Sequence, residues 1–171
     1  MITKKISIIG LGYVGLPLAT EFAKKYKVVG YDINIMRIKE LKKGIDRTKE
    51  ITNKKLLTND NLFFTYDLNY MKNSDFFILT VPTPITSKNK PDLSILKQAA
   101  LTIAKVLKKG ATIILESTVY PGITEDYLVP IVEKHAKLKH KKDFFVAYSP
   151  ERINPGETKY KLTNIKKVVG A

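Results

Sequence analysis

The 171-residue chain contains no cysteine, and this absence excludes several kinds of chemistry. Neither a disulfide framework nor a cysteine-ligated metal site can form, and no thiol nucleophile is present among these residues. The chain also lacks an apolar run long enough to span a membrane, and its N-terminus leads into a glycine-rich turn instead of a signal-peptide core. We therefore expect a cytoplasmic protein without a membrane partner, folded as one domain over residues 1–171.

Acidic residues are scarce relative to basic ones, and the formal net charge is +14. Such a charge concentrates phosphates, so nucleic acid is one partner to consider. The lysines, however, occur in pairs spread along the chain without a recognition motif, which favours a solvated lysine-rich surface. We expect no nucleic-acid partner. We also expect no metal site, because His135 and His140 lie among these lysines without acidic companions.

The opening of the chain carries the most informative motif. An apolar stretch that ends at Ile9 is followed by Gly10-Leu11-Gly12-Tyr13-Val14-Gly15, then by a helical pattern, then by Asp32 after a second apolar stretch. Glycine spacing alone would fit an ordinary strand-to-helix turn. A strand before it, a helix after it and an acid at this distance together indicate a dinucleotide-binding unit.

Each of the three glycines has a separate predicted task. Gly10 permits a tight turn, Gly12 has no Cβ to block a pyrophosphate, and Gly15 lets the helix lie close to the sheet. The helix that follows directs backbone N–H groups and a positive dipole end at the pyrophosphate. These features predict a binding site for a dinucleotide.

Asp32 indicates which dinucleotide is bound. A carboxylate about twenty residues after the glycine turn accepts hydrogen bonds from the adenine-side ribose and repels a 2′-phosphate, which favours NAD over NADP. Arg37 follows one helical turn later, near enough to stack on or pair with the adenosine. The alternative for Arg37 is an ordinary surface arginine.

Strand and helix patterns alternate along the rest of the chain. Unbroken apolar stretches of this kind are typical of parallel strands that are covered on both faces. We predict a Rossmann-type, doubly wound α/β fold with a mostly parallel sheet. The predicted strands are residues 62–64, 76–81, 111–115 and 144–148, and the predicted helices are residues 13–24, 35–44, 53–57, 92–110 and 124–135.

Polar residues follow three of the predicted strands, at Thr83, at Ser117-Thr118 and at Glu151. Because parallel strands end at one edge of a sheet, these residues should meet where open α/β sheets bind ligands. Thr83 is expected to contact the nicotinamide-side ribose, unless it makes a local turn bond. Ser117 and Thr118 either cap the next helix or contact cofactor or water. Glu151 is a candidate acid/base, or a structural partner of Arg152 or of a lysine.

The strings GLGYVGLPLA, YDIN followed by Arg37, PTP, ESTVYPG and SPERINPG occur in this order. Their combination resembles the N-terminal domain of the UDP-glucose and UDP-N-acetylhexosamine 6-dehydrogenases, over essentially the whole chain. SPERINPG is more similar to the branch that acts on UDP-N-acetylglucosamine or UDP-N-acetylgalactosamine. Such enzymes make uronic acids for capsules and other surface polysaccharides.

The resemblance implies a four-electron oxidation of the sugar C6 alcohol by two NAD, through a thiohemiacetal and a thioester. It also implies a role for each matching residue. Thr118 would help place a water or oxyanion, and Glu151 would be the acid/base of thioester hydrolysis. The implied cofactor contacts are Gly10, Gly12, Tyr13, Val14 and Gly15 on the pyrophosphate, Asp32 and Arg37 on the adenosine, and Thr83 and Thr118 at the nicotinamide end.

Two departures from the family pattern limit what is expected. The UDP-glucose members carry a second glutamate where this chain has Pro155, and the nearby Glu157 is out of register. The family's dimerising helix, UDP-binding domain and cysteine nucleophile do not occur in these residues. We expect an isolated domain that binds NAD without turnover, while the full-length form is a homodimer and binds the UDP-sugar mostly outside this chain. The rival interpretation is a non-catalytic NAD-sensing or interaction module, which would not need an acidic residue in SPERINPG.

Overall fold

The computed structural model describes residues 4–152 and 164–171. Its centre is a parallel sheet of six strands in the order β3-β2-β1-β4-β5-β6. This order and the helices on both faces confirm the predicted Rossmann-type α/β fold. The strands are β1 (Lys5–Ile9), β2 (Lys27–Tyr31), β3 (Leu62–Thr65), β4 (Phe76–Leu79), β5 (Ala111–Leu115) and β6 (Phe144–Tyr148).

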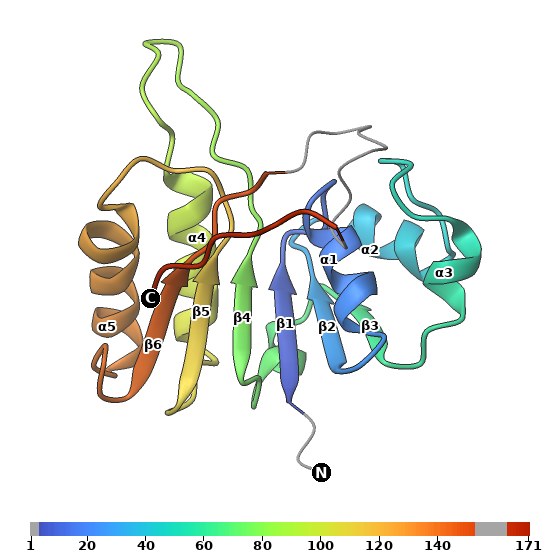
Figure 1. The fold of residues 1–171 in the computed structure, drawn as a ribbon, viewed down its shortest axis with the longest axis horizontal. Coiled ribbons are helices and arrows are strands. Elements are labelled where there is room, and N and C mark those ends of the chain that lie inside the picture. The colour runs from blue at the N-terminus through green and yellow to red at the C-terminus, as the bar shows by residue number, and fades with distance from the viewer. Residues whose placement is uncertain (1–3, 153–163) are drawn as a thin grey trace.

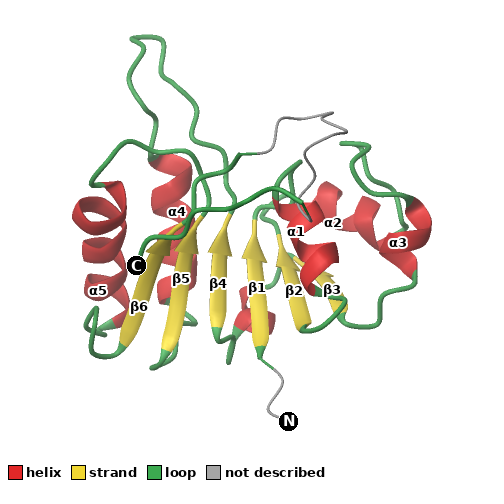
Figure 2. Ribbon diagram, in the orientation of Figure 1, coloured by secondary structure: helices red, strands yellow, loops and turns green. Residues whose placement is uncertain are grey.

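The helices form a layer on each face of the sheet (Figures 1 and 2). The sequence explains why helices cover both faces of the sheet. Successive strand residues point to opposite faces, and the residues on each face are apolar. In β1, Ile8 packs in the α1 core, whereas Ile9 packs in the α4 core. The first layer contains α1 (Gly15–Phe22), α2 (Ile35–Lys42) and α3 (Asn53–Leu57), and the second contains α4 (Ser94–Ala104) and α5 (Val129–Ala136).

Two shorter helical segments complete the connections. A 3₁₀ helix (Leu68–Met71) lies between β3 and β4, where its buried Met71 belongs to the core on the α4 face. A π-helical turn (Ile123–Leu128) leads directly into α5. The predicted helix over residues 124–135 is therefore present, but its first turns are wound more widely than an α-helix.

The ends of α4 differ from the prediction. Asp92 does accept a hydrogen bond from the backbone N–H of Ser94 at 2.9 Å, but the helix begins only at Ser94. It ends at Ala104, well before Gly110, because the N–H groups of Val106 and Leu107 both donate to the carbonyl of Ile103. This turn buries Val106 in the core. The packing of Val106 therefore accompanies the end of α4, which does not extend to Gly110.

The topology places a ligand site between β1 and β4. After β1 the chain continues toward β2 and β3, whereas after β4 it continues toward β5 and β6. The loops at the carboxyl ends of these two neighbouring strands therefore diverge and leave a crevice. This is the edge at which the sequence places its polar residues.

The last described segment, residues 164–171, returns to the sheet at β6. Tyr148 and Gly170 exchange two backbone hydrogen bonds, of 2.8 and 2.9 Å, as an antiparallel bridge. The segment runs past the carboxyl ends of the strands in Figure 1, where Lys167 reaches Glu116 just after β5. The C-terminal segment therefore contributes to the same edge of the sheet as the glycine turn.

Candidate cofactor-binding site

A cavity of about 940 Å³ opens at the carboxyl edge of the sheet. Its wall comes from the loops after β1, β2, β4 and β5, from α4, and from Glu151. Gly15 and Arg37 are not among the described residues that line it. The predicted site residues that do line it are Gly10, Gly12, Tyr13, Val14, Asp32, Thr83, Thr118 and Glu151.

The three motif glycines occupy three different environments. Gly10 has a φ of +96°, in the left-handed region, and its N–H donates to the Tyr31 carbonyl at 2.9 Å. A Cβ built on Gly15 would lie 1.9 Å from the Gly10 carbonyl oxygen and 2.4 Å from Thr80 Oγ1, so only glycine lets α1 start this close to the sheet. A Cβ on Gly12 would meet no heavy atom within 4 Å. Gly12 therefore leaves open space on the cavity side.

Asp32 connects β2 to the glycine turn. One carboxylate oxygen accepts from the N–H of Leu11 and the other from the N–H of Asn34, each at 2.8 Å. Each oxygen retains a lone pair for a ribose hydroxyl, since a carboxylate offers about four acceptor positions. The bond to Leu11 was not foreseen from the sequence. It shows that Asp32 also braces the turn that would hold the pyrophosphate.

Arg37 lies behind the glycine turn, where it is only 5% exposed. Its Nε donates to the carbonyl of Leu11 at 2.9 Å, and its Nη2 pairs with Asp46 at 2.8 Å. Burial raises the pKa of Asp46, but hydrogen bonds from Thr48, Arg37 and backbone N–H groups outweigh it, so the net shift is downward. The surface alternative for Arg37 is therefore wrong, whereas its contact with adenosine stays a prediction.

Asp46 was not predicted from the sequence as the partner of Arg37. The only local signal is its position just after Gly44, with Thr48 two residues later, a spacing that suits a carboxylate bonded to its own loop. Asp46 in fact accepts from both the N–H and the hydroxyl of Thr48. This loop anchors Arg37 and, through it, the glycine turn.

Hydroxyl groups join the loops after β1, β4 and β5. Thr83 Oγ1 donates to the carbonyl of Thr118 at 2.6 Å, and Ser117 Oγ donates to the carbonyl of Val81 at 2.6 Å. Thr80 Oγ1 donates to the carbonyl of Gly10 at 2.7 Å. The structure thus brings Thr83 and Thr118 together on the cavity wall, while Ser117 is buried and joins the two loops instead of capping a helix. The proposed nicotinamide contacts of Thr83 and Thr118 remain predictions.

A cluster of charged groups, which we call the acidic cluster, closes the other end of the cavity wall. It consists of Glu116, Glu151 and Lys167, and the Lys167 ammonium hydrogen-bonds to Glu116 Oε2 and lies 3.7 Å from Glu151 Oε2. Burial raises the pKa of Glu116; the Lys167 ammonium works against this shift, and the Glu151 carboxylate adds to it. The lysine contact foreseen as a structural alternative for Glu151 is thus present. Pro155 and Glu157 lie outside the described residues.

The cavity fits an extended dinucleotide. Asp32, where the adenosine end is predicted, lies beside β2, Gly12 leaves the middle open beside the start of α1, and the groups predicted for the nicotinamide end follow β4 and β5. In the first turn of α1 the N–H groups of Leu16 and Leu18 bond to the carbonyls of Gly12 and Val14, and Pro17 has no N–H. The backbone N–H groups that could face a diphosphate are therefore those of the glycine turn before it. The residues present therefore match the chemistry of NAD along its whole length.

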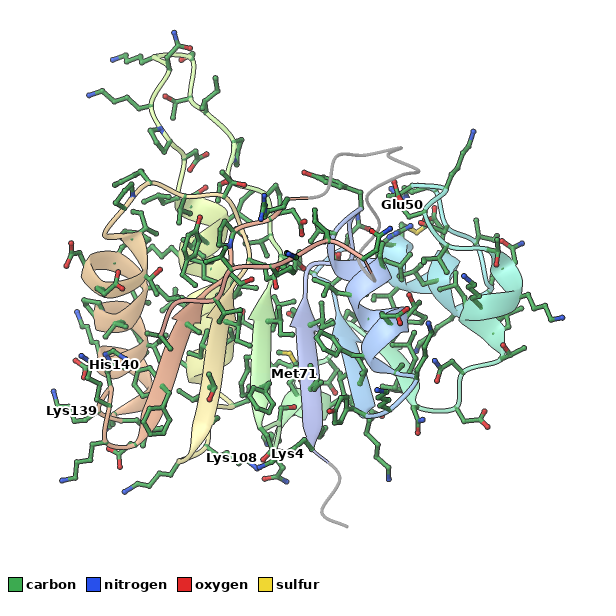
Figure 3. The ribbon with its side chains drawn as sticks, viewed as in Figure 1. Lys4, Glu50, Met71, Lys108, Lys139 and His140 are labelled. Carbon is green, nitrogen blue, oxygen red and sulfur yellow. The ribbon has the colours of Figure 1, made fainter. Side chains whose placement is uncertain are left out.

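Several of the lysines lie on the surface away from the cavity. Lys4 and Lys108 both pair with Asp75 at the amino edge of the sheet, opposite the cavity, and Figure 3 shows these two lysines side by side. Lys139 lies beside His140, near the end of α5, and pairs with Glu133. Among the described residues, no three acidic, histidine or cysteine side chains gather where they could hold a metal ion. None of the helices described is both long and apolar enough to cross a bilayer.

Comparison with known proteins agrees with this geometry. Residues 4–171 match the family model described as the UDP-glucose/GDP-mannose dehydrogenase family, NAD binding domain. The chain is 52% identical over 164 residues to UDP-N-acetyl-D-glucosamine 6-dehydrogenase of Pseudomonas aeruginosa, and 51% identical over 166 residues to protein CapL of Staphylococcus aureus. These matches cover 96% and 97% of this chain, but the chain spans only 39% of either relative.

A solved structure shows the same fold. NDP-N-acetyl-D-galactosaminuronic acid dehydrogenase of Methanosarcina mazei Go1 superposes with a TM-score of 0.88 at 31% sequence identity. The superposition covers 98% of this chain and 38% of that protein. In sequence and in backbone, the similarity therefore includes the whole sheet and the cavity at its edge.

Proposed function

Since the chain belongs to the UDP-glucose/GDP-mannose dehydrogenase family, of which it forms the NAD-binding domain, we propose that it serves in the oxidation of a UDP-N-acetylhexosamine at C6 to the uronic acid. The observation that carries this proposal is the continuous cavity from Asp32 past Gly12 to Glu151. It offers a ribose acceptor, room for a diphosphate and an acid/base in the order that the coenzyme needs.

Three parts of the site have separate roles in this proposal. Asp32 accepts the hydroxyls of the adenine-side ribose, and the glycine turn before α1 binds the diphosphate through backbone N–H groups. Thr118 orients a water or an oxyanion. When bound, NAD accepts hydride from the sugar carbon.

Glu151 moves a proton. Its carboxylate oxygen lies 3.7 Å from the Lys167 ammonium, which holds the group in the cavity wall, where it takes a proton from an attacking water. The 171 residues contain no cysteine, so a thioester mechanism requires a nucleophile from outside them. We propose that the remaining part of a full-length enzyme supplies this nucleophile, most of the UDP-sugar site and the contacts of a homodimer.

The proposed substrate is inferred from the proteins that this chain is similar to. A chain 52% identical to a UDP-N-acetyl-D-glucosamine 6-dehydrogenase, together with the string SPERINPG, supports a UDP-N-acetylhexosamine over UDP-glucose. A cytoplasmic enzyme that supplies uronic acids for surface polysaccharide fits this substrate. A non-catalytic NAD-sensing module is the alternative, and the buried carboxylates at the nicotinamide end of the cavity argue against it, because sensing needs no acid/base there.

A chimera tests the proposal. In the Pseudomonas aeruginosa relative, this chain would replace the 164 residues that it matches, and NADH formation would be followed with UDP-N-acetylglucosamine. We expect a chimera that reduces NAD only when the UDP-sugar is added, and a Glu151→Gln chimera that still binds NAD but is at least about 100-fold slower, since proton transfer contributes that much. A folded chimera that binds NAD without UDP-sugar oxidation would favour the sensing module.

A further inference from the structure

The acidic cluster has a composition that coenzyme binding alone does not require. The side chains of Glu116, Glu151 and Lys167 are 7%, 9% and 18% exposed. The ammonium of Lys167 lies between the two carboxylates and contacts both. Glu116 and Glu151 also line the cavity. The cluster is thus a largely buried group of three charges in the wall of the coenzyme site.

The charges of this cluster do not cancel. Two carboxylates and one ammonium give the cluster a formal charge of −1. Among the described residues that line the cavity, the charged ones are Asp32, Glu116 and Glu151, and none is basic. Asp32 is at the adenosine end, so the net charge at the nicotinamide end comes from the acidic cluster.

Lys167 makes this arrangement possible. Without a cation between them, two buried carboxylates would repel each other, and one would take up a proton. The ammonium between them offsets this repulsion, because it contacts both carboxylates, and it holds Glu151 beside Glu116. Lys167 is therefore a positioning residue for the negative charge, although it is 51 residues from Glu116 in the sequence.

We propose that the acidic cluster selects the oxidised form of the coenzyme, because its net negative charge attracts the cationic nicotinamide of NAD⁺ and gives no such attraction to the neutral ring of NADH. The inference rests on the proposed function, in that NAD occupies the cavity with its nicotinamide beside β4 and β5. Charge interactions are strengthened in such a partly buried wall relative to open water. Two successive oxidations of one sugar carbon require NADH to leave before a second NAD⁺ enters, and weaker binding of NADH serves that exchange.

The test compares the two redox forms on this chain. Isothermal titration would give Kd for NAD⁺, NADH and ADP-ribose with the wild type, Glu116→Gln and Glu151→Gln. Each substitution removes one negative charge and retains the shape of the side chain. Glu21→Gln is the matched control, because it makes the same change on α1, where Glu21 pairs only with Lys24 among the described residues.

We expect Kd(NADH)/Kd(NAD⁺) to fall by about three- to tenfold in both cluster variants, the size of a screened interaction between unit charges. The ratio should stay constant in Glu21→Gln. The Kd of ADP-ribose, which has no nicotinamide, should stay constant in every variant. This control distinguishes an effect of charge from a loss of structure.

Each other outcome has a definite meaning. An unchanged ratio in Glu151→Gln, with coenzyme still bound, would overturn the redox selection and leave the proposed function standing. Parallel weakening of ADP-ribose, NAD⁺ and NADH in Glu151→Gln would also overturn it, by showing that the cluster only supports the fold. If Glu116→Gln alone loses ADP-ribose binding, that variant has lost its structure. The Kd(NADH)/Kd(NAD⁺) ratio of Glu151→Gln then decides whether the redox selection stands. A wild-type chain that binds no NAD⁺ would contradict the proposed function itself.

Discussion

Replacement of Gly12 by alanine should separate coenzyme binding from stability. The new Cβ would meet no protein atom within 4 Å, and the φ of Gly12 lies outside the left-handed region, so alanine fits the backbone. Alanine in place of a compatible glycine reduces the entropy of the unfolded chain, which stabilises a protein by about 0.4–1 kcal/mol. We therefore expect a free energy of unfolding equal to or slightly above that of the wild type.

The same methyl group would occupy the space in which we propose that the diphosphate lies. Forcing a methyl group into a close contact costs about 1–3 kcal/mol, which corresponds to a loss of affinity of about 5- to 150-fold. Titration calorimetry would measure Kd for NAD, and urea unfolding would measure stability. Gly110→Ala is a matched control: its Cβ is also unobstructed, but its φ of +80° predicts a stability loss of about 1–2 kcal/mol without a change in Kd. If Gly12→Ala bound NAD as tightly as the wild type, the diphosphate could not lie against this turn.

Three further substitutions test other parts of the site. Gly15→Ala should lower the free energy of unfolding by about 3 kcal/mol or more, measured in urea, because its Cβ meets backbone at 1.9 Å and overpacking cannot be relieved there by a rotamer change; wild-type stability would refute the close approach of α1. Asp46→Asn should cost about 3–5 kcal/mol by leaving the buried Arg37 without its counter-charge. Because the folded-state pKa of Asp46 is lowered, its contribution is present above the unfolded pKa of about 3.8 and is lost as the pH falls through the folded value; acid unfolding of Asp46→Asn should therefore lack this loss, and an identical pH profile would contradict the assignment. Asp32→Ala should weaken NAD binding by about 1–3 kcal/mol in calorimetry, and an unchanged Kd would remove its ribose role.

Elements with strong local signals were predictable from the sequence. The apolar stretches Ala111–Leu115 and Phe144–Tyr148 are strands with the predicted bounds. The short helix Asn53–Leu57 also has its predicted bounds. Burial in Ala111–Leu115 alternates at the period of a strand, and Phe144–Tyr148 is an unbroken apolar run, so that a few neighbouring residues contain the information. The glycine turn was predictable for a similar reason, since its tightest contact, between Gly15 and the Gly10 carbonyl, joins residues close in the chain.

Long-range polar partners were not predictable in the same way. Lys167 is one of many lysines, and nothing near it in the chain indicates that it would meet Glu116. Likewise the pairing of Arg37 with Asp46 and the bond from Asp32 to Leu11 depend on where loops lie after the sheet has formed. Periodicity indicates which side chains are buried, but the partner of a buried charge is set by the tertiary fold.

The most direct test of the account is a pair of titrations on the unmodified chain, one with NAD and one with NADP. The central claim is that the glycine turn binds a diphosphate while Asp32 accepts the ribose hydroxyls beside it. It predicts one saturable site for NAD and weaker binding of NADP, because the carboxylate repels a 2′-phosphate. The absence of saturable NAD binding, or equal affinity for the two dinucleotides, would contradict it.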